Sequence, residues 1–118
     1  MTTIPVSNGE LVDKITILKI KINKIKIQSK LNNVLTEYNM LRQYLNDINF
    51  TEDHKLFKEL YNINLEFWEY HDWQRERWIK LQNDNYIDIE LFKKNKEEHL
   101  LNDKRARVKK EINNLTNS

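Results

Sequence analysis

Two side chains of opposite charge interrupt an apolar stripe in the middle of this sequence. Spacings of four, three and four residues place a set of side chains on one face of an α-helix: Trp68, Asp72, Arg75 and Ile79. A charge on the covered side of a helix is costly unless an opposite charge or a hydrogen-bond partner meets it. We therefore expect either a partner on a neighbouring helix or a site that is open to a ligand.

The first functional hypothesis is a polar binding pocket between helices. Charged residues near both ends of the chain would also line this pocket, and its ligand would be a protein partner or a small anionic molecule. The candidate binding residues are Glu10, Asp13, Lys14, Trp68, Glu69, Asp72, Arg75, Arg105 and Lys109. The alternative is a salt-bridge network that fixes the register of the helices, or exposure to solvent, and the rarity of fully buried charges favours it.

Carboxylates one helical turn apart raise a second hypothesis, a magnesium site for a nucleotide or phosphate-ester hydrolase. The candidate ligands are Glu10, Asp13, Glu66, Glu69 and Asp72. All-helical nucleotide pyrophosphatases hold Mg²⁺ in this way, but they are similar to this sequence in that respect alone, because their two acidic motifs occur in the opposite order and close together. Acidic residues at i and i+3 are also common on helices. The sequence therefore favours a protein with no cofactor and assigns no catalytic residue.

One structural observation separates these hypotheses. Convergence of the carboxylates in an open cleft with room for a cation would favour the enzyme. Pairing of the carboxylates with Lys14, Arg75 or Arg105 in a closed network would favour a scaffold.

Composition excludes several classes of protein. The absence of cysteine rules out disulfides, thiolate catalysis and cysteine-ligated metals. His54, His71 and His99 are too dispersed for a ligand motif. Twenty basic residues nearly balance 18 acidic ones, so charge does not favour nucleic acid, and no helix-turn-helix or basic-zipper signature occurs. With neither a leader nor a run of about 18 apolar residues, we expect a cytoplasmic protein without membrane association.

The first helix has a clear start signal. Ser7 and Glu10 form a capping box, and Val6 is expected to pack on Leu11 as a hydrophobic staple. An apolar stripe then recurs at helical spacing over residues 11–25. The alternation of residues 15–27 is also compatible with a β-strand, but the capping box and the lack of turn residues argue against it. We predict a break or kink near Ser29.

The remaining elements also read as helices. A second stripe covers residues 27–45, a turn covers 46–51, and Thr51 or Asp53 is the expected N-cap of a helix of about 30 residues, ~45 Å long. That helix is expected to end at residues 83–85, and Asp88 can cap the last helix. An interruption of the last helix at Asn102 and Asp103 is left open as an alternative. The prediction is an all-α fold, an antiparallel helical bundle of four or five helices with one long central helix, in a single domain over residues 1–118.

The tryptophans point to a contact surface. Trp68, Trp73 and Trp78 all lie in the long helix, and the last two fall outside its main stripe. Exposed aromatic side chains suggest a partner, whereas burial of the helix on more than one side would hide them. Self-association satisfies both interpretations, so we predict a homodimer.

Three segments carry a resemblance to a known family. The opening Val6-Ser7-Asn8-Gly9-Glu10-Leu11-Val12-Asp13-Lys14-Ile15-Thr16-Ile17-Leu18 resembles the start of a domain-of-unknown-function family of short bacterial and phage proteins. Residues 102–113 are similar to that family's Asn-Asp-x-Arg-Ala-x-x-Lys-x-Glu-Ile-Asn ending, and Trp68, Glu69, Asp72 and Arg75 match its central helix. Asn8 stands where the family has proline. The resemblance implies a full-length domain and no established activity.

The sequence thus predicts a helical interaction or ligand-binding protein without a recognised catalytic motif. The abundance of Lys, Asn and Ile is typical of an AT-rich genome, which agrees with a phage or bacterial origin.

Overall fold

All regular structure in the described part of the chain is helical. The computed structural model describes residues 3–84 and 89–118, and within them it describes no side chains at 79–84, 89–92 and 95. The helices are α1 (Asn8–Lys24), α2 (Gln28–Arg42), the single turn α3 (Tyr44–Asp47), α4 (Lys55–Asp84) and α5 (Ile89–Leu115). The predicted all-α bundle is confirmed. Over the described ranges, no helix is both long and apolar enough to cross a membrane.

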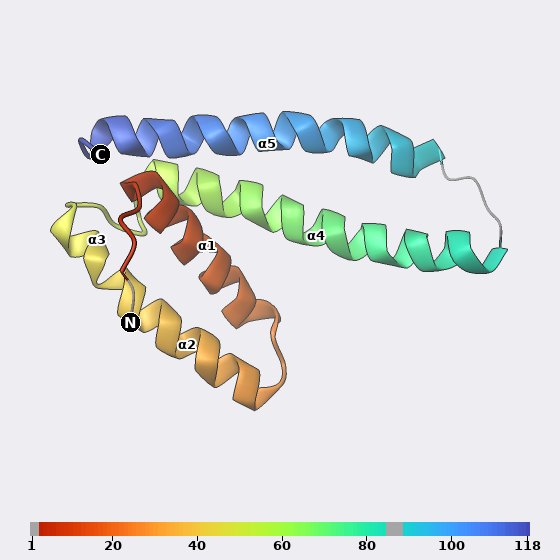
Figure 1. The fold of residues 1–118 in the computed structure, drawn as a ribbon, viewed down its shortest axis with the longest axis horizontal. Helices are drawn as coiled ribbons and strands as arrows, with labels where there is room; N and C mark the ends of the chain where they lie inside the picture. The colour runs from red at the N-terminus through yellow and green to blue at the C-terminus, as the bar shows by residue number, and fades with distance from the viewer. Residues whose placement is uncertain (1–2, 85–88) are drawn as a thin grey trace.

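The chain folds as two helical hairpins that meet at one end (Figure 1). α1 and α2 run back along each other, and so do the two long helices α4 and α5. α1 contacts α2, α4 and α5, so this helix of 17 residues is the packing centre. Its buried side chains lie on more than one side, because Val12, Ile15, Leu18 and Ile20 are all covered. A helix that three neighbours cover needs this wide apolar surface.

The start of α1 follows the predicted cap only in part. Ser7 precedes the helix, and its Oγ accepts the Glu10 amide at 3.2 Å. The predicted staple is wrong, because Val6 is 62% exposed. The predicted break also lies elsewhere: residues 25–27 are an extended connection after which the chain reverses, and α2 begins at Gln28, ahead of Ser29. The strand alternative is wrong for residues 15–24, which are helical.

A polar clamp holds α2 against α1 and the loop that precedes α4. Tyr38 is 9% exposed, and its hydroxyl donates to the Glu52 carboxylate at 2.6 Å. Lys19 of α1 lies 3.5 Å from the same carboxylate. Asn49 turns the loop with a φ of 52°, a left-handed conformation that asparagine tolerates. Three segments therefore meet at the Glu52 carboxylate.

The boundaries of the long helices correct one further prediction and exclude one alternative. His54, and neither Thr51 nor Asp53, precedes α4, and its Nδ1 accepts the Leu56 amide at 3.0 Å. α5 runs through residues 102 and 103 without interruption, because those side chains are exposed polar groups on a helix whose buried positions lie further on. α4 is described as far as Asp84, so the predicted helix end at 83–85 and the predicted cap at Asp88 reach into residues 85–88, outside the described residues.

The core lies where the two hairpins meet, and α4 and α5 extend beyond it (Figure 1). The buried residues of α4 fall between Leu56 and Phe67, and those of α5 are Val108 and Ile112, counting only described side chains. The molecule measures 52 × 34 × 29 Å along its principal axes. The long helix therefore projects beyond the core.

The Tyr38 clamp predicts a loss of stability at high pH. Burial, with the Glu52 hydrogen bond and charge, raises the pKa of Tyr38 from 10.0 to about 12. The folded phenol keeps its proton while the unfolded one ionises, so its contribution is fully present below pH 10 and is lost as pH rises toward 12. We expect tyrosinate absorbance to show a step near pH 12 that Tyr38→Phe removes and Glu52→Gln moves to lower pH. A step that Glu52→Gln leaves in place would contradict the clamp.

Candidate functional site

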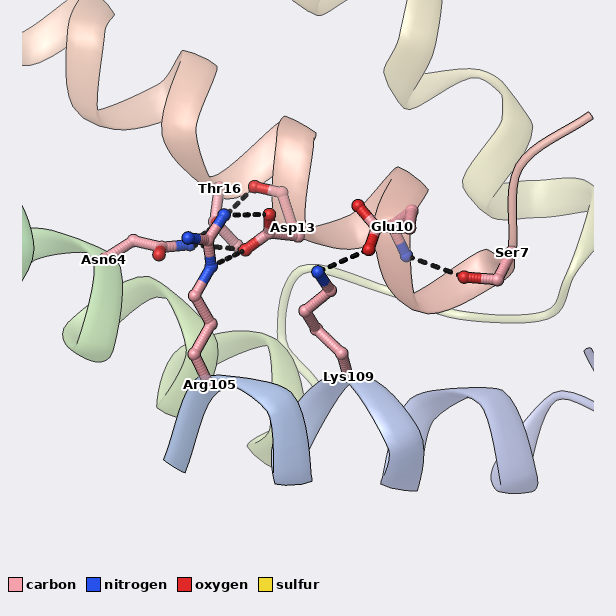
Figure 2. Close-up of polar contacts among 7 residues, drawn as sticks. All are labelled: Ser7, Glu10, Asp13, Thr16, Asn64, Arg105 and Lys109. Atoms are coloured by element: carbon pink, nitrogen blue, oxygen red, sulfur yellow. Dashed lines mark hydrogen bonds and ion pairs between the residues drawn. The ribbon is translucent and has the colours of Figure 1, made fainter. Parts of the chain in front are cut away.

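Two ion pairs join α1 to α5 in antiparallel order. Glu10 contacts the Lys109 ammonium, and one turn further along α1 Asp13 contacts Arg105, one turn earlier on α5. Figure 2 shows both α5 side chains reaching across to α1. Because the residue numbers rise on α1 as they fall on α5, the two pairs fix the register of these helices. We call this ladder the α1–α5 seam.

Asp13 is the most connected side chain of the seam. Its carboxylate is 5% exposed and receives Arg105 Nε at 2.9 Å on one oxygen and Arg105 Nη2 at 2.5 Å on the other. Asn64 of α4 donates its Nδ2 to Asp13 Oδ1 at 2.9 Å and to Thr16 Oγ1 at 2.8 Å. The Thr16 hydroxyl donates to the Asp13 carbonyl at 2.6 Å. The buried carboxylate thus has partners from α4 and α5, and Thr16 of α1 joins the same network through Asn64 (Figure 2).

Arg105 is held in its charged form by this arrangement. The hydrogen bond to Asp13 raises the pKa of Arg105 above its usual value, against the opposing effect of burial. Its guanidinium also lies 5.8 Å from the centre of the Phe67 ring, a cation–π distance. A two-point bond between guanidinium and carboxylate fixes orientation as well as distance. Arg105 therefore acts as a rigid strut between α4, α5 and α1.

The seam continues to the first turn of α1, where residues at the end of the chain accept hydrogen bonds from backbone amides that have no partner within the helix. The Gly9 amide donates to Asn113 Oδ1 at 2.6 Å, and the Asn8 amide donates to Ser118 Oγ at 2.8 Å. Asn117, with a φ of 59°, turns the chain so that Ser118 reaches α1. A Cβ on Gly9 would clash with the Lys109 carbonyl oxygen, so only glycine permits this approach. The end of α5 therefore caps the start of α1.

Several predicted site residues lie outside the seam. Asp72 and Arg75 pair with each other and are 52% and 70% exposed, which is the alternative of solvent exposure that the sequence left open. The last buried residue of α4 with a described side chain is Phe67, so this pair lies beyond the core. Lys14 pairs with Glu37 of α2 at 3.1 Å on the surface. Ile79 has no described side chain.

Two further candidates lie on the projecting part of α4. Trp68 is half-buried beside His71 and Arg75. Glu69 is exposed and lines a groove between α4 and α5. Neither side chain reaches the seam. The structure thus unites Glu10, Asp13, Arg105 and Lys109 and leaves the other five candidate binding residues apart.

The carboxylates of the magnesium hypothesis do not converge. Across the described residues, no group of three or more His, Asp or Glu side chains is placed to hold a metal ion. Asp13 and Glu10 are engaged by Arg105 and Lys109, whereas Glu66 and Glu69 line the α4–α5 groove. By the criterion set from the sequence, this pattern favours a scaffold over an enzyme.

Sequence reasoning missed four members of the seam, Thr16, Asn64, Asn113 and Ser118. Asn64 stands inside the apolar stripe of α4, and a buried amide in such a position signals a polar partner. Thr16 stands inside the stripe of α1 in the same way. Asn113 was part of the quoted ending, but its role depends on the contact with Gly9, which no local pattern reveals.

The seam forms a closed network. Among the described residues, no buried side-chain nitrogen or oxygen lacks a hydrogen-bond partner. Because the lone pairs of Asp13 are already shared by Arg105 and Asn64, a ligand would have to displace protein groups. The geometry therefore supports a structural role, in which the seam locks three helices together.

We predict that Asp13→Asn costs about 2 to 4 kcal/mol of unfolding free energy, because the part-buried Arg105 charge loses its counter-ion. Glu37→Gln is a matched control, since it breaks the exposed Lys14 pair by the same chemical change and should cost less than about 1 kcal/mol. Urea unfolding followed by circular dichroism measures both values. Equal losses for the two variants would refute the role given to the seam.

Comparison with known proteins identifies the family to which the chain belongs. A family model described as Family of unknown function (DUF6165) matches residues 2–118. No curated protein and no solved structure matches the chain. The prediction of a domain family without established activity is confirmed, while the bacterial or phage origin stays a prediction. Across nearly its whole length, then, the chain belongs to this family of unknown function.

Proposed function

We propose that this protein is a non-enzymatic interaction protein that dimerises through the projecting half of its α4–α5 hairpin. We call this part the arm: residues 68–84 of α4 and 89–104 of α5. The observation that carries the proposal is that the core lies at one end of the α4–α5 hairpin and does not extend into the arm. All three tryptophans lie on the arm, and none of its described side chains is buried.

The exposed apolar groups of the arm support this proposal. Trp78 is 53% exposed and Leu100 is 63% exposed. Tyr70 and Trp73 stack with ring centres 6.1 Å apart, and both line a groove of about 620 Å³ between α4 and α5. Two helices side by side cannot enclose a core, whereas four can. A second hairpin laid on the arm would complete a four-helix bundle.

A second copy of the chain fits this surface by charge. Within the described part of the arm, residues 68–78 of α4 carry three acidic and two basic side chains, whereas residues 93–104 of α5 carry four basic and three acidic ones. In a two-fold symmetric antiparallel dimer, α4 of each copy lies on α5 of the other, so that opposite charges meet.

The size of the arm is sufficient for such a contact. At 1.5 Å per residue the arm is about 25 Å long, and two helices are about 20 Å wide together. Each copy then offers a face of roughly 500 Å². The two faces bury about 1,000 Å² in total, the lower limit for a specific interface.

Light scattering over a concentration series tests the proposal. We expect the native chain to reach twice its 14.5 kDa mass, and Trp78→Glu and Leu100→Glu to stay monomeric because each places a charge in the apolar contact. Met40→Glu is the control, since Met40 is 56% exposed but lies on α2, away from the arm. A native chain that remains monomeric, or arm variants that dimerise as well as the control, would refute it.

A further inference from the structure

A second feature of the fold, separate from the arm and the seam, is an open cleft of about 1,120 Å³. It lies between α1, the α2–α3 segment, the loop that follows and the first turns of α4. Its volume is slightly above the usual range of small-molecule sites, roughly 300–1,000 Å³. The cleft exists because α2 stops at Arg42 and the single turn α3 leads the chain away before α4 begins.

The floor of the cleft is rigid. Leu45, Phe50 and Phe57 line it and are almost fully buried in the core. The Tyr38 and Lys19 contacts to Glu52 tie together the loop, α2 and α1 at the same place. Glu52 is 19% exposed and its carboxylate is already engaged. A cleft with a fixed floor loses little conformational entropy when a ligand enters.

Cations from three elements face this cleft. Lys19 comes from α1, Arg42 from α2 and Lys58 from α4. Arg42 lies over the Tyr38 ring at 5.7 Å, and neither Arg42 nor Lys58 forms an ion pair with any described residue. Since arginine presents a planar fork of donors, this arrangement suits a phosphate or carboxylate group.

The rest of the lining is rich in groups that recognise hydroxyls. The side-chain amides of Asn39, Gln43, Asn46 and Asn62 line the cleft, and no side-chain hydrogen bond to the described residues engages them. Each amide both donates and accepts. The exposed carboxylate of Asp53 adds an acceptor at the rim. Such a set matches a polyhydroxylated body better than an apolar one.

We infer that this cleft binds a small phosphomonoester of a sugar, with Arg42 and Lys58 on the phosphate and the amides with Asp53 on the hydroxyls. The volume is too large for inorganic phosphate alone, and the two unpaired cations leave a charge for the ligand to neutralise. The inference does not depend on dimerisation, because the cleft and the arm share no residue.

A titration of the ¹⁵N-labelled full chain tests this inference, with ribose 5-phosphate, adenosine monophosphate, inorganic phosphate and ribose as separate probes. We expect saturable shifts of the Arg42, Asn46 and Asn62 signals with ribose 5-phosphate, binding weaker by about tenfold for phosphate alone, and none for ribose. If adenosine monophosphate binds at least as tightly as ribose 5-phosphate, the ligand is a nucleotide. If it binds more weakly than ribose 5-phosphate, the ligand is a simple sugar phosphate.

Two variants and a control make the result specific. Arg42→Gln and Lys58→Gln, both at exposed positions, should each weaken binding by about tenfold and keep the helical circular dichroism. Lys30→Gln removes an exposed lysine of α2 outside the cleft and should leave binding unchanged. Absence of saturable shifts, shifts spread over the lysines of α1 and α2, or equal affinity in all three variants would overturn the inference.

Discussion

The structure depends on one constraint: a carboxylate at a position that is 5% exposed must be neutralised by the protein itself. Asp13 finds its counter-ion in Arg105, which is 92 residues away in the sequence, and a further donor in Asn64 of α4. These partners are in place only when α1, α4 and α5 have docked together. The pair thus links the burial of one charge to the closure of the whole core, and this is why an ionic contact decides the register of apolar helices.

Local patterns predicted the helices well because helical periodicity and capping need only a few neighbouring residues. Ser7 and the stripe that follows are examples. The same reasoning failed where a second helix decides the outcome. Asp72 and Asp13 both lie on helical faces, but only Asp13 is covered, and the sequence does not say where α1 stops covering α4. The reversal at residues 25–27 was placed late for a related reason, since it contains neither glycine nor proline.

Closing the core at one end of the long hairpin leaves two surfaces, the arm and the cleft, on which the proposed functions rest. The arm carries aromatic and charged groups away from the core, and the cleft gathers cations and amides where α2, α3 and the loop depart from α4. Both surfaces need a rigid base, because a hinge where the two hairpins meet would let the side chains on these surfaces change their relative positions. The ionic seam supports this base from one side, and the Tyr38 clamp supports it from the other, where Lys19 and Glu52 also line the cleft.

Native-state hydrogen exchange tests the central claim most directly, since it measures the opening free energy of each amide. If Asp13 and Arg105 lock the helices into one cooperative unit, the core amides of α1 around Asp13 and of α5 from Arg105 to Ile112 should open with the same free energy, equal to that of global unfolding. Exchange of the α1 amides through an opening of much lower free energy, while those of α5 stay protected, would contradict the account.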